Sequence, residues 1–497
     1  MKKNITILLV IVVCTMVSVP FVGASLENIQ STLFTGSEQD PIPSEWPDEA
    51  GVKPDMIGAK KADRPYIFMD ESEIEVPQSV VEDSIDLWYG DTQKFGQIGN
   101  PQEWVNILGN VSLDNAVQTL TYSLNGGPEQ PLTVGLNNVR LAKTGDFNIE
   151  IAYPDLIDGV NTVEIKATDY FVPSQEFSKT LTLNYSAGNV WPTDYLADWG
   201  SSSDIQDIAQ VVDGKWAIEG GKLVTKEVGY DRLVAIGDET WKDYEVTVPI
   251  TVKSLEQAAL QSGPGVGLLM RWQGHNQDPD NPQQPRKDFM RVGGIGWYRW
   301  LSNGTEGLEL RGYDWSHGSS TAKVWDFNVP YYLKMSVQSS PTPGDERAYY
   351  RLKFWKQADP EPAIWDIEGW SLAPSEPDDL FIESGSVVLL AHHLDAEFGP
   401  VQVKDVTKLI FTLNTSVDGN GIIDVQPVNK KNWAYGEQVV LKALPNPGYQ
   451  FDHWSGSISS DEYILSTFMT QDLDVTAHFV EGPTMFYANL PVVLSEN

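Results

Sequence analysis

The sequence predicts an all-β protein with several sandwich-type domains in series. Apolar and polar residues alternate over many short segments, such as residues 163–168, and this period of two places one face of a strand in a core. Clusters of Gly, Asn and Asp separate these segments, and helical periodicity of useful length is missing. With 497 residues, 17 Trp, 19 Tyr and 17 Phe, the chain exceeds one ordinary core, so two to four domains are expected.

Residues 1–24 have the layout of a secretory signal peptide. Two lysines precede an apolar run over residues 5–22 and a Val-Gly-Ala exit follows, so cleavage after Ala24 is predicted. A retained signal-anchor helix is the alternative, because the run approaches a membrane span in length. Cleavage would also remove Cys14, the only cysteine. We therefore expect a secreted or cell-surface-associated mature chain without disulfides.

The chain is strongly acidic. Its formal charge of −35 becomes −37 when the two signal lysines are removed (−35 − 2). Such a surface repels phosphate backbones and anionic lipid, which argues against nucleic acid as a partner and against peripheral membrane binding. A second apolar segment of membrane-spanning length is missing, so we expect no membrane insertion after signal cleavage. Cysteine-based zinc and redox sites are excluded.

Residues 25–67 and 68–187 differ in pattern. The first segment carries five prolines among acids and small residues and is predicted to be a linker or stalk. The second has short alternating strands and turn signals that suit a sandwich of about 100 residues. Its end resembles the L-x-x-G-x-N-x-V-x-I-x-A-x-D pattern of bacterial Ig-like modules, carried by Leu156, Gly159, Asn161, Val163, Ile165, Ala167 and Asp169. This resemblance implies an Ig-like sandwich that serves as a spacer or adhesion unit.

Residues 190–410 hold twelve of the 17 Trp. A clean strand is predicted in which Tyr244, Val246, Val248 and Ile250 share one face. The segment opens with W-x-I-x-G-G-x-L at 216–223 and closes with G-x-V-x-V-x-D-V at 399–406. These features resemble a concanavalin-like, laminin-G-type jelly roll.

Residues 411–480 carry a longer ordered set of matches. Val439, Leu441 and Ala443 point inward on one predicted strand, and Trp454 can fill the centre. The segment resembles the internalin B-repeat, a small β-grasp-like module, through Asp418-Gly419-Asn420-Gly421, Pro427, Tyr435-Gly436, Val439, Leu441, Ala443, Pro445, Gly448-Tyr449, Phe451, Trp454, Met469, Val475, Ala477 and Phe479. The tail over 481–497 is apolar at residues 486–494 and lacks an L-P-x-T-G sorting motif, so its role stays open.

One window of the jelly roll combines the residue types that sugar recognition needs. Flat aromatic faces stack on sugar rings, and planar donors and carboxylates bind hydroxyl groups. Core packing is the alternative for each Trp, because alternate Trp on a strand are usually buried; Trp300 and Trp315 are preferred as ligand residues, since turn residues surround them. The predicted ligand-binding residues are Arg271, Trp272, His275, Trp297, Trp300, Asp314, Trp315 and His317.

Catalysis is the alternative function for this domain. Laminarinase-like hydrolases of this fold use the motif Glu-x-Asp-x-x-Glu, which the chain lacks. The sequence at residues 365–368 is the most similar one, but it lacks the third acid. Alginate-lyase-like enzymes use an Arg element, a Gln-x-His strand and a Tyr-rich strand. Gln273, His275 and Tyr350 match two of these elements, and the Arg-Ser/Thr-Glu element is missing. A polysaccharide lyase or glycosidase therefore stays the alternative, with His275 as the candidate base.

Metal binding receives weaker support. His392 and His393 are neighbours on a predicted strand, so they point to opposite faces and cannot chelate one ion together; His453 and His478 are expected in structural or solvated roles. Oxygen-rich stretches at 276–282 and at Asp418 with Asn420 would suit Ca²⁺, and they are also ordinary turn chemistry. A metal site is not predicted, and Ca²⁺ is the one cofactor kept as an alternative.

The sequence thus predicts an exported, non-catalytic protein that binds a polysaccharide or cell-surface glycan. The glycan assignment rests on analogy at the level of the fold. A structural surface or adhesion protein is the second alternative, beside the lyase or glycosidase.

Overall fold

The computed structural model describes residues 66–67, 83–113, 116–137, 139–171, 173–276, 284–288, 291–312, 315–320, 323–342, 344–373, 381–428 and 430–482. The predicted signal peptide, most of the predicted linker and almost all of the C-terminal tail lie outside these residues. Asp314 and most of the oxygen-rich stretch at 276–282 also lie outside them.

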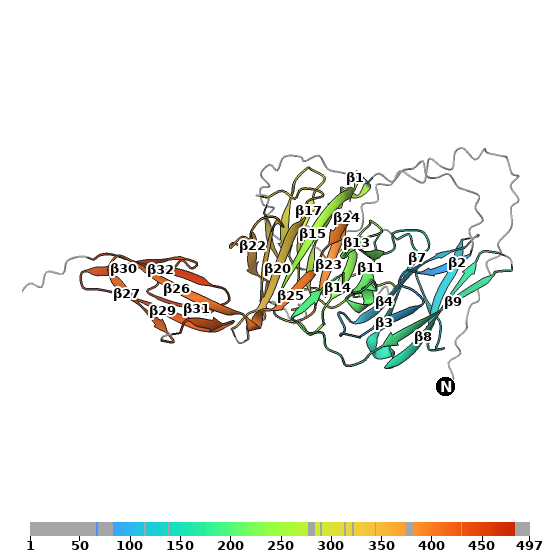
Figure 1. Cartoon of the computed structure of the whole chain (residues 1–497), viewed down its shortest axis with the longest axis horizontal. Helices are drawn as coiled ribbons and strands as arrows, with labels where there is room; N and C mark the ends of the chain where they lie inside the picture. The colour runs from blue at the N-terminus through green and yellow to red at the C-terminus, as the bar shows by residue number, and fades with distance from the viewer. Residues whose placement is uncertain are drawn as a thin grey trace, which may run out of the picture. The chain divides into compact units, whose positions relative to one another are not determined.

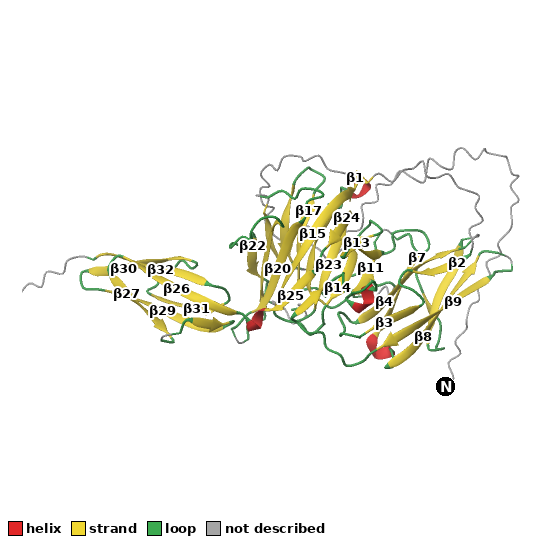
Figure 2. Cartoon of the chain, in the orientation of Figure 1, coloured by secondary structure: helices red, strands yellow, loops and turns green. Residues whose placement is uncertain are grey.

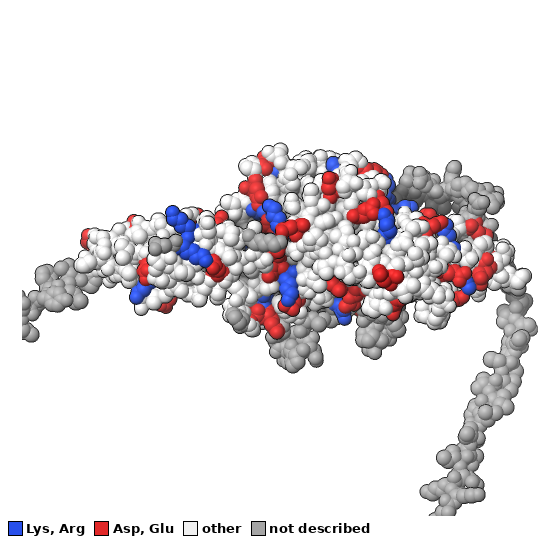
Figure 3. Space-filling view, turned by 60° about the horizontal axis from the view of Figure 1, so that its bottom comes forward, with Lys and Arg blue, Asp and Glu red and all other residues white. Residues whose placement is uncertain are grey.

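The all-β prediction is confirmed. Figure 2 shows strands joined by loops with a few short helical turns, and those turns are 3-10 turns in the described residues. A helix long and apolar enough to cross a membrane is not found among them. Figure 3 shows Asp and Glu spread over the visible face with Lys and Arg between them.

The N-terminal sandwich consists of two facing sheets, ordered β2-β4-β7 and β3-β9-β8-β5-β6. Val163, Ile165 and Ala167 of β8 are fully buried between them, as their alternation predicted. Gly159 has a φ of +99°, which glycine adopts without strain, and this accounts for the glycine of the Ig-like pattern. The sandwich contains β2 (Ser84–Leu87), β3 (Thr92–Phe95), β4 (Trp104–Ser112), β5 (Val117–Leu124), β6 (Gln130–Pro131), β7 (Asp146–Ala152), η3 (Tyr153–Asp155), β8 (Gly159–Asp169) and β9 (Glu176–Tyr185).

The central jelly roll also has two sheets. The β15 sheet follows the order β12-β13-β24-β15-β20-β21-β22, with β1, β10 and β25 attached beside it, and the β16 sheet follows the order β11-β14-β23-β16-β17-β18-β19. Figure 1 labels β13, β24, β15, β20 and β22 across this body, so strands far apart in the sequence lie side by side. The elements are β1 (Tyr66–Ile67), β10 (Tyr195–Ala197), η4 (Ile205–Asp207), β11 (Gln210–Asp213), β12 (Trp216–Glu219), β13 (Lys222–Thr225), β14 (Arg232–Ile236), β15 (Tyr244–Glu256), η5 (Gln257–Ala259), β16 (Gly265–Trp272), β17 (Gly294–Trp300), β18 (Glu306–Arg311), β19 (Ser316–Ser320), β20 (Tyr331–Ser339), β21 (Ala348–Lys356), β22 (Ile367–Trp370), β23 (Ser386–His392), β24 (Leu394–Phe398), β25 (Val401–Asp405) and η6 (Val406–Lys408).

The core of the jelly roll lies between these two sheets. Tyr244, Val246, Val248 and Ile250 of β15 are fully buried there, which confirms the predicted inward face. Because successive side chains of a strand alternate between faces, the odd-numbered residues of β20 face this core and the even-numbered ones face outward. The same alternation orders β21, where the even-numbered residues face inward.

The C-terminal module is a smaller pair of sheets, ordered β28-β26-β32-β30 and β27-β29-β31. Trp454 is fully buried between them with Val439 and Leu441, as the sequence predicted. The module contains β26 (Ile410–Asp418), β27 (Gly421–Gln426), β28 (Asn432–Ala434), β29 (Glu437–Pro445), β30 (Tyr449–Gly456), β31 (Ile464–Met469) and β32 (Leu473–Glu481).

Candidate functional site

The preferred tryptophans of the predicted sugar site are core residues. Trp300 is 0% exposed and packs inside the sandwich beside Tyr298, with ring centroids 4.8 Å apart. Trp315 is 6% exposed and packs against Tyr350 at 4.9 Å. A buried ring cannot offer its face to a sugar, so this corrects the expectation that these two rings bind ligand. The alternative interpretation, core packing, accounts for both.

Trp297 faces outward from the β16 sheet, but its ring faces are already covered. A Cβ built on Gly265 would lie 2.8 Å from Cε3 of the Trp297 indole, so the ring lies directly against this glycine. The Arg299 guanidinium carbon lies 4.4 Å from the ring centroid, and the indole N–H donates to Glu309 at 2.9 Å. Trp297 is therefore a packed residue with satisfied partners rather than an open stacking surface.

Arg271 organises one end of the sandwich instead of binding a ligand. It is fully buried at a bulge of β16 and has a φ of +54°. Its guanidinium donates to the carbonyl groups of Lys242 and Ile382, both at 3.0 Å, and to the Ser339 hydroxyl at 2.8 Å. These bonds use the donors that a sugar or carboxylate would require, which corrects the prediction for this residue.

Trp272 and His275 form part of the contact between the jelly roll and the N-terminal sandwich. The Trp272 indole N–H donates to the Gln102 side chain at 3.0 Å, and the indole N–H of Trp104 donates to the His275 carbonyl at 2.9 Å. Trp272 and His275 are 0% and 1% exposed. The motif around residue 272 thus holds two sandwiches together, which corrects its assignment to a sugar site.

A buried charge network lies in this contact. Arg140 from the N-terminal sandwich donates to Glu150 at 2.6 Å and to Asp213 of β11 at 2.7 Å. His275 Nε2 lies 2.8 Å from the second oxygen of Asp213. Burial opposes the charge of both partners, but attraction outweighs it: the pKa of Arg140 is raised by Asp213 and Glu150, and that of Asp213 is lowered by Arg140 and His275. The network is fully enclosed, so removal of one partner would leave the others buried without their counter-charge.

The candidate lyase residues are not brought together into a reacting site. His275 is held at the contact between the sandwiches, and the Gln273 amide donates to the Ser384 carbonyl at 3.0 Å. Tyr350 points into the jelly-roll core and is 1% exposed. Burial raises the pKa of Tyr350 to about 12, so its hydroxyl is a poor acid–base group near neutral pH. This corrects the alternative assignment of these three residues.

Among the predicted ligand residues that the structure describes, His317 is the one at the surface. It is exposed on β19, and its Nε2 lies 2.7 Å from the Trp370 carbonyl oxygen of β22. A Cβ on Gly369 would come within 2.4 Å of the imidazole, so the ring covers this glycine. Gly369 pairs with the core residue Tyr350, so His317 lies at the inward side of β22. It does not lie on the outer face of the β15 sheet, where a different group of aromatic residues is found.

Five aromatic side chains form an aromatic strip on that outer face: Tyr332, Tyr349, Trp355, Trp365 and Trp370. Trp355 is 8% exposed, and the other four are half-buried. Tyr332 pairs across the strands with Trp355, and Tyr349 pairs with Trp370. Their ring centroids lie 5.3 and 5.0 Å apart. Two exposed aliphatic side chains, Ile364 and Leu372, flank β22.

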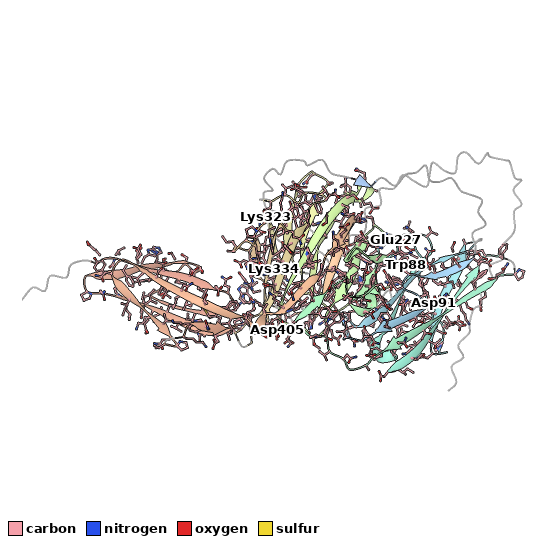
Figure 4. All side chains as sticks on the ribbon, in the orientation of Figure 1. Trp88, Asp91, Glu227, Lys323, Lys334 and Asp405 are labelled. Carbon is pink, nitrogen blue, oxygen red and sulfur yellow. The ribbon has the colours of Figure 1, made fainter. Side chains whose placement is uncertain are left out.

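Trp365 lies between the two pairs and is supported by cations. The distances from its ring centroid are 4.6 Å to Lys353 Nζ, 4.9 Å to the Arg351 guanidinium carbon and 5.8 Å to Lys334 Nζ. Figure 4 labels Lys334 on β20. Cations attract the ring face they approach, so they hold this indole in place over the sheet. A ring fixed in this way loses little conformational entropy when a ligand stacks on it.

Lysine and glutamate side chains form ion pairs with one another between the rings. Lys334 contacts Glu245 at 2.7 Å and Glu361 at 2.8 Å, and Lys353 contacts Glu361 at 2.8 Å. Burial lowers the pKa of Lys334, but the two glutamates outweigh it and raise the pKa overall. Burial together with Glu368 raises the pKa of Tyr349 to about 12. The strip therefore offers hydroxyl, carboxylate and ammonium groups beside its rings.

The sequence contained a pattern that points to this strip. Along β21 the outward residues Tyr349, Arg351, Lys353 and Trp355 alternate with the core residues Tyr350, Leu352 and Phe354. Aromatic and cationic side chains on the face opposite an apolar face indicate an exposed aromatic surface. Our sequence prediction concentrated on the Trp-dense window and missed Tyr332, Tyr349, Trp355, Trp365 and Trp370.

The histidines and acids give no metal cluster in the described part of the chain: groups of three or more His, Cys, Asp or Glu placed to hold a metal ion are not found there. His392 and His393 each bind their own carboxylate, Asp231 at 2.7 Å and Glu256 at 2.6 Å. Asp418, one of the two oxygen-rich positions considered for Ca²⁺, lies 2.9 Å from His478.

Comparison with known proteins gave one family and several structural neighbours. A model described as "divergent InlB B-repeat domain" matches residues 411–483, which confirms the B-repeat resemblance. No curated protein matched the sequence.

Solved structures similar to this chain include carbohydrate recognition and lumenal domains, at low similarity. The metal-free Emp46p carbohydrate recognition domain is 11% identical and covers 43% of this chain and 98% of that chain, with a TM-score of 0.30. The Emp47p carbohydrate recognition domain is 11% identical and covers 44% and 98%, with a TM-score of 0.28. The VIP36 exoplasmic/lumenal domain bound to Ca²⁺ and Man2 is 11% identical and covers 40% and 81%, with a TM-score of 0.25. At these identities and scores, the ligands of those proteins are not transferred to this chain.

Proposed function

We propose that this chain is a non-catalytic glycan-binding protein that holds its ligand on the aromatic strip of the central jelly roll. The observation that carries the proposal is the arrangement of five outward rings with Trp365 in the middle; four of the five, Trp365 among them, are half-buried. Rings that are partly exposed and fixed from below stack on the apolar faces of sugars, while polar groups beside them bind hydroxyls. The strip supplies both kinds of contact on one sheet face.

The location we propose is outside the cell. This rests on the predicted signal peptide over residues 1–24 and on the acidic composition, which suits a solvated extracellular chain. The N-terminal sandwich would then serve as a spacer that is firmly joined to the binding domain through the Arg140 network. The B-repeat module would act as a further spacer or contact another surface.

The proposal is tested by gel retardation of the full chain on a panel of polysaccharides. The acidic protein migrates readily toward the anode, so retention by an embedded polysaccharide is easily measured. We expect Trp365→Ala, and separately Trp370→Ala, to abolish retardation. Tyr463→Ala is the matched control, because Tyr463 is a 53% exposed ring on the B-repeat module.

Two outcomes would refute the proposal. Retardation that persists in a folded Trp365→Ala, Trp370→Ala double variant would place the glycan site elsewhere. Lack of retardation with every polysaccharide, and of any signal on a glycan array, would favour a purely structural surface protein.

A further inference from the structure

The aromatic strip has three stations in a row along β21. Tyr349 with Trp370 forms the first station, and Tyr332, the half-buried ring that packs on the buried Trp355, forms the third. Trp365 forms the second, because it lies over Arg351 and Lys353, the two outward residues between positions 349 and 355. The order of the stations is therefore fixed by the register of one strand.

The length of the strip exceeds that of one sugar. Positions 349 and 355 are six residues apart on a continuous strand, which at ~3.3 Å per residue corresponds to roughly 20 Å. Only several consecutive sugar rings can span such a length. A ligand that contacts all three stations must therefore be an extended chain, bound along its side rather than by its end.

The charges of the strip favour an uncharged ligand. Lys334 and Lys353 are already paired with Glu245 and Glu361, and the Arg351 guanidinium donates to Ser336 while Glu368 lies opposite it in register. The chain as a whole has a formal charge of −35, which repels a polyanion at long range. Binding a charged polymer would require some of these pairs to be broken.

We infer that the ligand of the aromatic strip is the interior of a neutral, linear, ribbon-like polysaccharide of the β-1,4-linked class. The inference rests on the proposed function of the strip and adds the class of ligand. Chains with equatorial 1,4 linkages are straight ribbons with flat faces, whereas α-1,4-linked chains coil and cannot lie on three aligned stations at once. The sheet face supplies the matching straight surface.

The test compares related polymers in native gels of the full chain. Hydroxyethylcellulose is a neutral β-1,4 chain, carboxymethylcellulose carries the same backbone with anionic groups, and soluble starch is a neutral α-1,4 chain. We expect strong retardation by hydroxyethylcellulose, weaker retardation by carboxymethylcellulose and none by starch. Equal retardation by starch and hydroxyethylcellulose, or none by hydroxyethylcellulose, would overturn the inference.

A second measurement uses cello-oligosaccharides of graded length in titration calorimetry. Affinity should rise by about tenfold or more between the trimer and the hexamer, because the longer chain adds stacking contacts at further stations. Trp365→Ala should flatten this rise, and the control Tyr463→Ala should leave it unchanged. Equal affinities of trimer and hexamer would show that the strip recognises a short or terminal unit.

These outcomes separate the two proposals. If strip variants abolish binding to a branched or coiled glycan found on an array, the proposed function stands and the inference about the ligand class fails. If the strip variants leave all glycan binding intact, the proposed function itself fails.

Discussion

The Trp-dense window over residues 271–317 and the aromatic strip contain similar side chains in opposite environments. Trp300 is fully buried in the jelly-roll core, whereas Trp365 is half-buried on the outer face of the β15 sheet. In the window, charged side chains form hydrogen bonds with other buried groups. In the strip, they lie beside aromatic rings that are partly exposed to solvent. The face on which an aromatic residue lies, and not the density of aromatic residues, therefore separates a core from a candidate binding surface.

The largest expected effect is on the buried side of this comparison. Trp300→Ala should lower the free energy of unfolding by about 4 kcal/mol, because it removes buried apolar surface and leaves a cavity. Urea unfolding followed by tryptophan fluorescence measures this loss. A loss below about 1 kcal/mol would mean that Trp300 is not a core residue, and the contrast with the strip would disappear.

The contact between the two sandwiches should be nearly as sensitive. Arg140→Met leaves Glu150 and Asp213 buried without their cation, and removal of one partner from a buried ion network costs about 3 kcal/mol. Thermal unfolding measures the change. The exposed pair of Lys226 and Glu219 provides the control, since Lys226→Met should cost no more than about 0.5 kcal/mol. Equal effects of the two variants would contradict the enclosed network.

A pH effect should come from His392 at the end of β23. Burial lowers the pKa of His392 below its ordinary value of 6.5, and attraction to Asp231 opposes this only in part. The unfolded chain then binds the proton more tightly than the folded chain. The neutral imidazole therefore contributes to the free energy of unfolding above pH 6.5, and this contribution is lost as the pH falls below that value. The slope from this one group is at most about 1.4 kcal/mol per pH unit.

His392→Gln should therefore reduce the fall in melting temperature between pH 7 and pH 5. His317→Gln is the matched control, because this side chain is exposed. An unchanged pH profile in His392→Gln, or an equal change in the control, would contradict the assignment.

The smallest expected effect on stability belongs to the strip. Trp365→Ala should lower the free energy of unfolding by only about 1 kcal/mol, since a half-buried ring loses less apolar surface and its cation contacts lie near solvent. The same urea titration used for Trp300→Ala gives the direct comparison. A loss as large as that of Trp300→Ala would make Trp365 a structural residue and weaken its role as a ligand surface.

Much of the fold was readable from the sequence. The alternation over residues 163–168, the inward face of β15 and the central position of Trp454 were all predicted correctly, because a period of two fixes which side chains share a face. The B-repeat segment was identified from its ordered pattern and is matched over 411–483. The Ig-like assignment of the N-terminal sandwich stays a prediction.

The candidate site was less predictable. Alternation showed that Trp297 and Arg299 share a face of β17, but it could not show that the glycine at 265 lets the Trp297 ring lie against the neighbouring strand. Trp272 and His275 were predicted as ligand residues because their side-chain types suit sugar recognition. The sequence could not show that Trp272 bonds to Gln102 of the N-terminal sandwich, or that the His275 carbonyl accepts from Trp104 there. Contacts between separate sandwiches leave no local pattern in either segment.

By itself, the sequence determined that this is an acidic, cysteine-poor chain of β sandwiches with one B-repeat module, because composition and local periodicity are properties of short segments. Which tryptophans are enclosed and which face outward follows from the assembled fold. The burial of each tryptophan depends on how two sheets stack, on which strands become neighbours and on where a second sandwich covers the first. Burial is a property of the assembled layers, so it is absent from any single strand.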